Sequence, residues 1–176
     1  MSELRTATFG GGCFWCIDAA FRRVKGVQQV SSGYSGGHVE HPTYHQICAE
    51  DTGHAEVVQL VYDEQKIDYP TLLKMFFALH DPTTLNRQGN DIGPQYRSVI
   101  FYHGDQQKHQ AELVMERLQE HLDDAIVTEL LPAQEFYPAE SYHQDYFSAN
   151  PRQPYCNLLI APKIAKFEKE FDAYLV

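Results

Sequence analysis

The chain has 176 residues, of which 43% are hydrophobic, and its 24 acidic and 14 basic side chains give a formal net charge of −10. This size and apolar content suit one domain spanning residues 1–176, while the acidic balance disfavours nucleic acid as a partner. No stretch approaches the roughly 20 apolar residues of a membrane helix, and residues 1–12 lack a signal-peptide pattern. We therefore expect a cytoplasmic monomer without membrane contact.

The first half of the chain predicts strand, helix, strand, strand, helix. A strand over residues 5–9 runs into three glycines, and a helix follows in which apolar residues recur at helical spacing. Strands are expected over 27–34 and 55–62, the latter apolar on nearly every position and thus central in a sheet. A polar, histidine-containing loop over 35–46 separates them. Asp68 is expected to cap a helix that ends near residue 79.

The second half predicts one more strand–helix–strand run. A turn-rich loop over 81–95 is long enough to indicate a functional role. It leads into a strand over 98–102 and an amphipathic helix over about 104–122. Further strands are expected near 126–131 and 134–136.

The tail completes the predicted architecture. It is expected to hold a short helix over 141–148, a proline-rich stretch to Cys156 and a final helix after Pro162. The order β-α-β-β-α-β predicts an α+β fold, a ferredoxin-like split βαβ two-layer sandwich with an irregular C-terminal extension.

The segment GGGCFWC, residues 10–16, is the most informative stretch. It places Cys13 at a strand-to-helix turn, where unpaired N–H groups and the helix dipole favour the thiolate and lower the thiol pKa. The glycines allow a sharp turn and leave room for a ligand to reach the sulfur. Phe14 and Trp15 can wall an apolar slot beside it. A tight turn with no chemistry would also need the glycines.

Cys16 lies one helical turn after Cys13, so a disulfide between them is sterically plausible. It could equally be a small apolar residue facing the core. Zinc binding with His38, His41 and His45 is a third interpretation, but one C-x-x-C pair is weak evidence for it. Four cysteines in a chain of this length are too few for a disulfide framework.

Glu56 is the one carboxyl on a strand that is otherwise predicted to be buried. It alternates with Val58, Leu60 and Tyr62 on one face. Burial removes hydration from a carboxylate and raises its pKa, and a neutral carboxylic acid can give a proton to an oxygen that gains charge. The alternative is a strand-end glutamate exposed to water next to His54.

Three further polar residues stand in loops rich in proline and glycine. Tyr44 and Tyr96 carry phenols that often line polar pockets, and Asp91 alone is typical of an Asx-type turn.

Six segments together resemble the A-type peptide methionine sulfoxide reductases, which are specific for the S epimer. They are GGGCFWC at 10–16, YSGG at 34–37, PTYHQIC at 42–48, TGHAEVV at 52–58, NDIGPQYRS at 90–98 and YHQDYFSANPRQPYC at 142–156. The resemblance runs through nearly the whole chain, and the combination of GCFW, TGHAEVV and QYRS is highly specific.

The resemblance implies a role for each candidate residue. Cys13 is the nucleophile and Glu56 the acid, and Tyr44 and Tyr96 hydrogen-bond the sulfoxide oxygen. Asp91 organises polar contacts in the pocket.

By the same resemblance, Phe14 and Trp15 hold the methyl group of the substrate. Cys156 stands where the family often keeps its recycling cysteine, on a mobile C-terminal segment. Because many members lack a cysteine at position 16, either Cys16 or Cys156 could resolve the first intermediate, or both in a relay. Cys48 is interpreted as structural.

The implied partners are methionine sulfoxide, free or in proteins, and thioredoxin as external reductant, with no metal and no bound cofactor. Two other hypotheses stay open on the residues alone. One is a thioredoxin-like disulfide oxidoreductase built on Cys13-x-x-Cys16, and the other is a non-enzymatic metal-binding module.

Overall fold

The computed structural model of the protein describes residues 3–49, 52–150 and 152–176. Its strands are β1 (Leu4–Gly10), β2 (Val27–Ser35), β3 (Ala55–Asp63), β4 (Arg87–Gln88), β5 (Asp91–Ile92), β6 (Val99–Tyr102), β7 (Glu129–Pro132) and β8 (Tyr137–Pro138). Its helices are α1 (Phe14–Phe21), α2 (Tyr44–Ala49), α3 (Tyr69–Ala78), α4 (Asp105–Gln119), α5 (Tyr146–Ala149) and α6 (Ala161–Glu170). Among the described residues, no helix combines the length and apolar character needed to cross a bilayer.

Six strands form one sheet in the order β7-β6-β1-β3-β2-β8, and β4 and β5 form a separate hairpin. Only β6 and β7 pair in parallel; the other neighbours in the sheet are antiparallel. Thus β1 and β2 run parallel with β3 between them, and β3 and β6 run parallel with β1 between them. The crossovers through α1 and α3 interleave, which is the split βαβ plan. The predicted fold class is confirmed.

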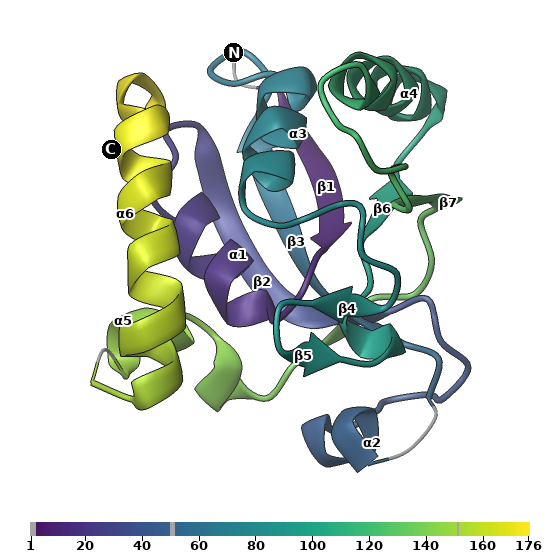
Figure 1. The fold of residues 1–176 in the computed structure, drawn as a ribbon, viewed down its shortest axis with the longest axis vertical. Helices are drawn as coiled ribbons and strands as arrows, with labels where there is room; N and C mark the ends of the chain where they lie inside the picture. The colour runs from purple at the N-terminus through teal and green to yellow at the C-terminus, as the bar shows by residue number, and fades with distance from the viewer. Residues whose placement is uncertain (1–2, 50–51, 151) are drawn as a thin grey trace.

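The core lies between the sheet and its helices. Figure 1 shows α1 and α3 over the same face of the sheet, with α6 beside α1 and α4 beside α3. Phe9 of β1 stacks on Phe76 with ring centroids 4.9 Å apart, and on Phe21 and Tyr69 at 5.9 Å. These aromatic contacts join the central strand β1 to both crossover helices.

The start of α3 follows its sequence signal. The Asp68 carboxylate accepts a hydrogen bond from the Thr71 N–H at 2.9 Å, and Pro70 stands in the first turn. This satisfies one of the N–H groups that a helix start leaves unpaired. The predicted cap is confirmed.

A helix replaces part of the loop expected over 35–46. The Thr43 hydroxyl accepts from the Gln46 N–H at 3.2 Å, and the Gln46 amide accepts from the Thr43 N–H at 2.9 Å. This reciprocal pair is a capping box, and it starts α2 at Tyr44. The loop prediction is therefore wrong at its C-terminal end, where T-x-x-Q at 43–46 starts a helix.

Several other boundaries differ from the prediction. The 81–95 loop contains the β4–β5 hairpin, and α4 ends at Gln119 rather than near residue 122. Strand β7 starts at Glu129 rather than 126, because the N–H of Val127 bonds the Pro82 carbonyl at 2.8 Å instead of a strand. Strand β8 lies at 137–138 rather than 134–136.

The helix expected over 141–148 is broken in two. Asp145 has a φ of 53° and separates a 3-10 turn at Ser141–His143 from α5. A left-handed residue cannot continue a right-handed helix. The final helix is preceded by a π turn at Cys156–Ile160, which the sequence pattern did not indicate.

Leu72, fully buried under the sheet on α3, tests this core. We expect Leu72→Ala to lower the free energy of unfolding by about 2–5 kcal/mol, because it removes buried methyl groups and leaves a cavity. Urea denaturation measures the loss. Lys74→Ala, on the exposed side of the same helix, serves as the control, with a change within about 0.5 kcal/mol. Equal losses in both variants would contradict the packing described.

Candidate active site

The end of β1, the start of α1 and the start of β3 meet at the lower end of the molecule in Figure 1, close to α2 and the β4–β5 hairpin. Cys13 is the residue that precedes α1, with extended backbone (φ −63°, ψ 128°). Gly12 has a φ of 83°, which favours glycine, and its N–H donates to the Tyr96 carbonyl at 3.1 Å. A Cβ on Gly10 would lie 2.8 Å from the Glu56 carbonyl oxygen. The glycines therefore allow the close approach of Cys13 to β3.

Glu56 is buried, with 1% of its surface exposed. Its Oε1 accepts a hydrogen bond from the Phe14 N–H at 3.2 Å, and its Oε2 has no hydrogen-bond partner among the described residues. Burial raises the pKa of this carboxyl from 4.5 to about 8, against the lowering effect of the Phe14 N–H. The predicted burial of this carboxyl is confirmed, and the exposed strand-end alternative is wrong. Its raised pKa favours the neutral form at neutral pH.

The pKa of the Cys13 thiol differs in direction from the sequence prediction. Burial raises the pKa of its thiol well above 9.0, the charge of Glu56 raises it further, and the Trp15 N–H at the helix start lowers it. The expected effect of the helix start is therefore present, but desolvation and Glu56 outweigh it. The prediction that Cys13 has a lowered pKa was wrong for the free protein, in which the thiol is protonated at neutral pH.

Tyr44 and Tyr96 both lie near Cys13 and Glu56. Tyr44 begins α2 and Tyr96 ends a 3-10 turn at Pro94–Tyr96, so neither stands in an irregular loop as predicted. Burial raises the pKa of each phenol, and the charges of Glu56 and Cys13 raise it further. Both hydroxyls stay protonated and can donate hydrogen bonds.

Asp91 reaches the site from the β4–β5 hairpin. Its Oδ2 accepts a hydrogen bond from the Tyr155 hydroxyl, and its charge raises the pKa of both Cys13 and Glu56. Sequence reasoning gave Tyr155 no role. The contact joins the hairpin to the C-terminal segment, and it explains why Asp91 is more than a turn residue.

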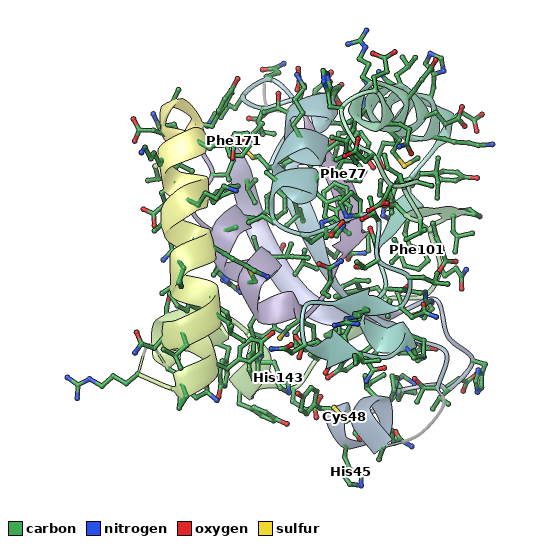
Figure 2. The ribbon with its side chains drawn as sticks, viewed as in Figure 1. His45, Cys48, Phe77, Phe101, His143 and Phe171 are labelled. Carbon is green, nitrogen blue, oxygen red and sulfur yellow. The ribbon has the colours of Figure 1, made fainter. Side chains whose placement is uncertain are left out.

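Phe14 and Trp15 meet a set of aromatic rings that the sequence did not single out. Trp15 stacks on Tyr146 at 3.8 Å with an interplanar angle of 10°, and its indole N–H donates to Nδ1 of His143 at 3.0 Å. Phe14 is fully buried and packs on His143 at 5.3 Å. Figure 2 shows His143 at this end of the molecule, near Cys48 on α2.

Glu140 was also missed. Its carboxylate accepts from the Tyr34 hydroxyl at 3.2 Å and from the Tyr44 N–H at 3.0 Å, so it fixes the start of α2 relative to the sheet. The segment YHQDY is part of the resemblance, yet nothing in its spacing shows that His143 lies under Trp15. Such roles depend on tertiary contacts between residues more than 100 positions apart in the chain.

The four cysteines are all unpaired thiols and lie in different surroundings. A pocket of about 340 Å³ is lined by Cys13, Cys16, Asp91, Tyr155 and Lys163, among others. Cys16 is 7% exposed, and burial raises the pKa of its thiol to about 11. Cys156 is fully buried at the start of the π turn and is absent from the described lining of this pocket.

Cys48 is exposed on α2, beside the hydroxyl of Tyr44. Among the residues that the structure describes, no group of three or more His, Cys, Asp or Glu side chains is placed to hold a metal ion.

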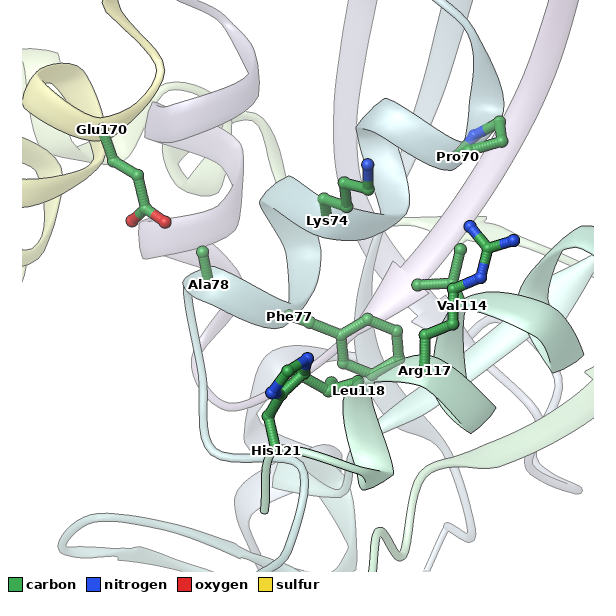
Figure 3. A pocket seen from close by; sticks show the side chains of 9 residues that line it. All are labelled: Pro70, Lys74, Phe77, Ala78, Val114, Arg117, Leu118, His121 and Glu170. Atoms are coloured by element: carbon green, nitrogen blue, oxygen red, sulfur yellow. The ribbon is translucent and has the colours of Figure 1, made fainter.

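A second cavity of about 360 Å³ lies between α3 and α4 (Figure 3). Phe77, Val114 and Leu118 form its apolar wall, and Lys74 and Arg117 stand at its edge. No thiol is among the described side chains that line it, so it is separate from the Cys13 chemistry.

The arrangement predicts how the Cys13 thiol titrates. Glu56→Gln removes the carboxylate charge, so we expect the pKa of Cys13 to fall; Asp91→Asn should lower it less, because the charge of Asp91 acts more weakly. The pH dependence of Cys13 alkylation, followed by peptide mass spectrometry, gives both values. An unchanged Cys13 pKa in Glu56→Gln would show that the two groups do not interact.

A family model and curated relatives of this chain all carry the same family name. The family model described as "Peptide methionine sulfoxide reductase" matches residues 5–175. Curated relatives named "Peptide methionine sulfoxide reductase MsrA" include one from Acinetobacter baumannii, 57% identical over 170 residues (96% of this chain and 97% of the relative). Another, from Haloquadratum walsbyi, is 54% identical over 175 residues and 99% of both chains.

Solved structures of similar fold include proteins of the same kind. Reduced Mxr1 from Saccharomyces cerevisiae has a TM-score of 0.80 at 34% identity and covers 86% of this chain and 88% of its own. Methionine sulfoxide reductase A of Corynebacterium diphtheriae has a TM-score of 0.79 at 36% identity and covers 85% and 76%. Mxr1 has also been solved in complex with Trx2, with a TM-score of 0.57, 25% identity, and coverage of 82% of this chain and 85% of that one. On the sequence match and this shared fold, the chain belongs to the peptide methionine sulfoxide reductase family.

Proposed function

We propose that this chain reduces methionine S-sulfoxide, free or within proteins, to methionine, with Cys13 as the nucleophile and Glu56 as the acid. The observation that carries the proposal is the buried carboxyl of Glu56, whose raised pKa favours the neutral form and whose charge acts on the Cys13 thiol. Its Oε2 has no hydrogen-bond partner in the described parts of the chain. Family membership supports the substrate class. The S preference follows from the resemblance to the A-type family.

The first half-reaction is a two-electron exchange between two sulfur atoms. The Cys13 sulfur attacks the sulfoxide sulfur, and the sulfoxide oxygen is transferred in the net reaction, so that methionine leaves and Cys13 becomes a sulfenic acid. The oxygen accumulates negative charge on the way, and the Glu56 carboxylic acid donates a proton to it. The hydroxyls of Tyr44 and Tyr96 stabilise the same charge by hydrogen bonding.

The raised pKa of Cys13 fits this chemistry in a specific way. In the free protein the thiol and the carboxyl are both protonated at neutral pH, because two charges in one desolvated space are unfavourable. A bound sulfoxide brings a partly positive sulfur next to the thiol, which favours the thiolate at the moment of attack. The nucleophile is therefore generated only when substrate is present.

The substrate methyl group needs an apolar wall opposite the polar S=O. We assign this wall to Phe14 and Trp15, held by the contacts of Trp15 with Tyr146 and His143. Asp91 organises the polar side of the pocket through Tyr155.

We further propose that Cys16 resolves the sulfenic acid. Cys16 lines the same pocket as Cys13, whereas Cys156 lies fully buried outside its described lining. The Cys16 thiol condenses with the sulfenic acid to give a disulfide and water. Cys156 can then take part only in a later exchange, after the segment that holds it rearranges.

An external dithiol returns the enzyme to the reduced state by thiol–disulfide exchange. The solved Mxr1–Trx2 complex supports thioredoxin as this reductant. The proposed reaction uses no metal and no bound cofactor, takes place in one catalytic domain over residues 1–176, and suits the reducing cytoplasm. The alternative, a thioredoxin-like disulfide oxidoreductase, gives the buried Glu56 no role.

Replacing the acid tests the proposal directly. Glu56→Gln should slow methionine formation by about 10²–10⁴-fold in a single turnover, the range for general acid catalysis. Cys13→Ser should abolish it. Methionine released from the S-sulfoxide is measured by chromatography, and a disulfide substrate is assayed in parallel. A Glu56→Gln enzyme with nearly full single-turnover rate would contradict the proposed acid.

Separate cysteine variants test the resolving step. Cys156→Ser should still form a Cys13–Cys16 disulfide after one turnover, whereas Cys16→Ser should accumulate the Cys13 sulfenic acid and turn over slowly with thioredoxin. Mass spectrometry of trapped peptides locates the bond. A Cys13–Cys156 disulfide in the wild type, with normal turnover of Cys16→Ser, would assign the role to Cys156 instead.

A further inference from the structure

Burial makes the Cys16 thiol a poor nucleophile for the proposed resolving step. Burial raises the pKa of Cys16 to about 11, so it is almost entirely protonated at neutral pH. The thiolate is the attacking form in condensation with a sulfenic acid and in disulfide exchange. Some group must therefore favour the Cys16 thiolate if the step is to be fast.

Lys163 occupies the position such a group requires. It stands in the first turn of α6, which packs beside α1 (Figure 1), and it lines the pocket that contains Cys13 and Cys16. Its ammonium is the one cationic group among the described residues of that lining. It also forms no salt bridge with any carboxylate in the described parts of the chain.

The other titratable groups around this pocket cannot substitute for it. Cys13 belongs to the same helix start, Tyr155 comes from the C-terminal segment, and Asp91 comes from the hairpin. Asp91 is anionic, and Cys13 and Tyr155 are neutral or become anionic on ionisation, so none of them stabilises a thiolate by charge. The positive charge of Lys163 favours the Cys16 thiolate and acts against the effect of burial.

We propose that Lys163 is a positioning residue for the resolving step, and that its ammonium stabilises the Cys16 thiolate as it attacks the Cys13 sulfenic acid. The inference rests on the proposed role of Cys16 as resolving cysteine. In this proposal Lys163 acts in disulfide formation and not in the reduction of the sulfoxide.

The step balances without another reactant. Cys16 gives up its thiol proton, its sulfur forms a bond to the Cys13 sulfur, and the S–O bond of the sulfenic acid breaks. The departing hydroxide takes a proton and leaves as water. The Cys13 sulfur is reduced and the Cys16 sulfur oxidised, so the disulfide holds the oxidation carried by the sulfenic acid.

Lys163→Gln and Lys163→Arg, both in a Cys156→Ser background, test the proposal. Lys166→Gln is the matched control, because Lys166 lies on the same helix and is absent from the described lining of the Cys16 pocket. The reduced enzyme is mixed with one equivalent of methionine S-sulfoxide and quenched at intervals. Methionine is quantified by chromatography, and the sulfenic acid and disulfide by mass spectrometry, across the pH range in which the variants stay folded.

Lys163→Gln should slow disulfide formation more than methionine formation, so that the sulfenic acid accumulates. Each unit by which the Cys16 pKa rises lowers the thiolate fraction tenfold and raises its nucleophilicity about threefold, for a net loss of about threefold. The rate of disulfide formation should rise with pH in both proteins, and the deficit of Lys163→Gln should close as the pH approaches the Cys16 pKa of about 11. A structural defect would leave the deficit unchanged at high pH. Lys163→Arg should restore the profile, and Lys166→Gln should match the parent.

An unchanged pH profile in Lys163→Gln, with Cys16→Ser still blocking disulfide formation, would overturn the role of Lys163 and leave that of Cys16 intact. Full disulfide formation in a Cys16→Ser variant that retains Cys156 would instead overturn the resolving role of Cys16. Loss of methionine formation and disulfide formation by the same factor would place Lys163 in the first half-reaction and contradict the inference.

Discussion

The site depends on one constraint: Cys13 and Glu56 share a desolvated space that does not favour two negative charges. The Phe14 N–H, at the start of α1, donates to Glu56 Oε1 and so ties the helix that carries the thiol to the strand that carries the acid. Gly10 allows the two backbones to approach, because a Cβ there would contact the Glu56 carbonyl. Burial raises the pKa of both groups, and the charge of Glu56 raises that of Cys13 further. The acid therefore stays neutral and the thiol stays protonated until substrate arrives.

Keeping Glu56 neutral is unfavourable for folding at neutral pH. Its pKa in the folded protein is about 8, above the ordinary value of 4.5. The contribution of Glu56 to the free energy of unfolding is therefore most favourable below about pH 4.5, and it is lost as the pH rises through about 8. Packing of the buried core elsewhere must offset this loss. The chain thus accepts a local loss of stability at the residue whose proton the chemistry needs.

Local patterns predicted the parts of the site that depend on chain neighbours. The glycines before Cys13, the alternation around Glu56 and the cap at Asp68 each indicated the correct local structure, and the strand–helix order indicated the sheet plan. The sign of the Cys13 pKa shift could not be predicted, because it is the balance of a local helix-start effect and the distance to a residue 43 positions away. The contacts of His143, Glu140 and Tyr155 likewise join segments distant in the sequence, and no spacing rule shows them.

The protonation state of Glu56 in the free protein is the central physical claim. Infrared difference spectroscopy between the wild type and Glu56→Gln, recorded as a function of pH, follows the carbonyl band of a protonated carboxyl at this position. We expect the band to be present at neutral pH and to disappear with a midpoint near 8. Loss of the band at a pH near the ordinary value of 4.5 would instead show that Glu56 is ionised at neutral pH, which contradicts a neutral acid.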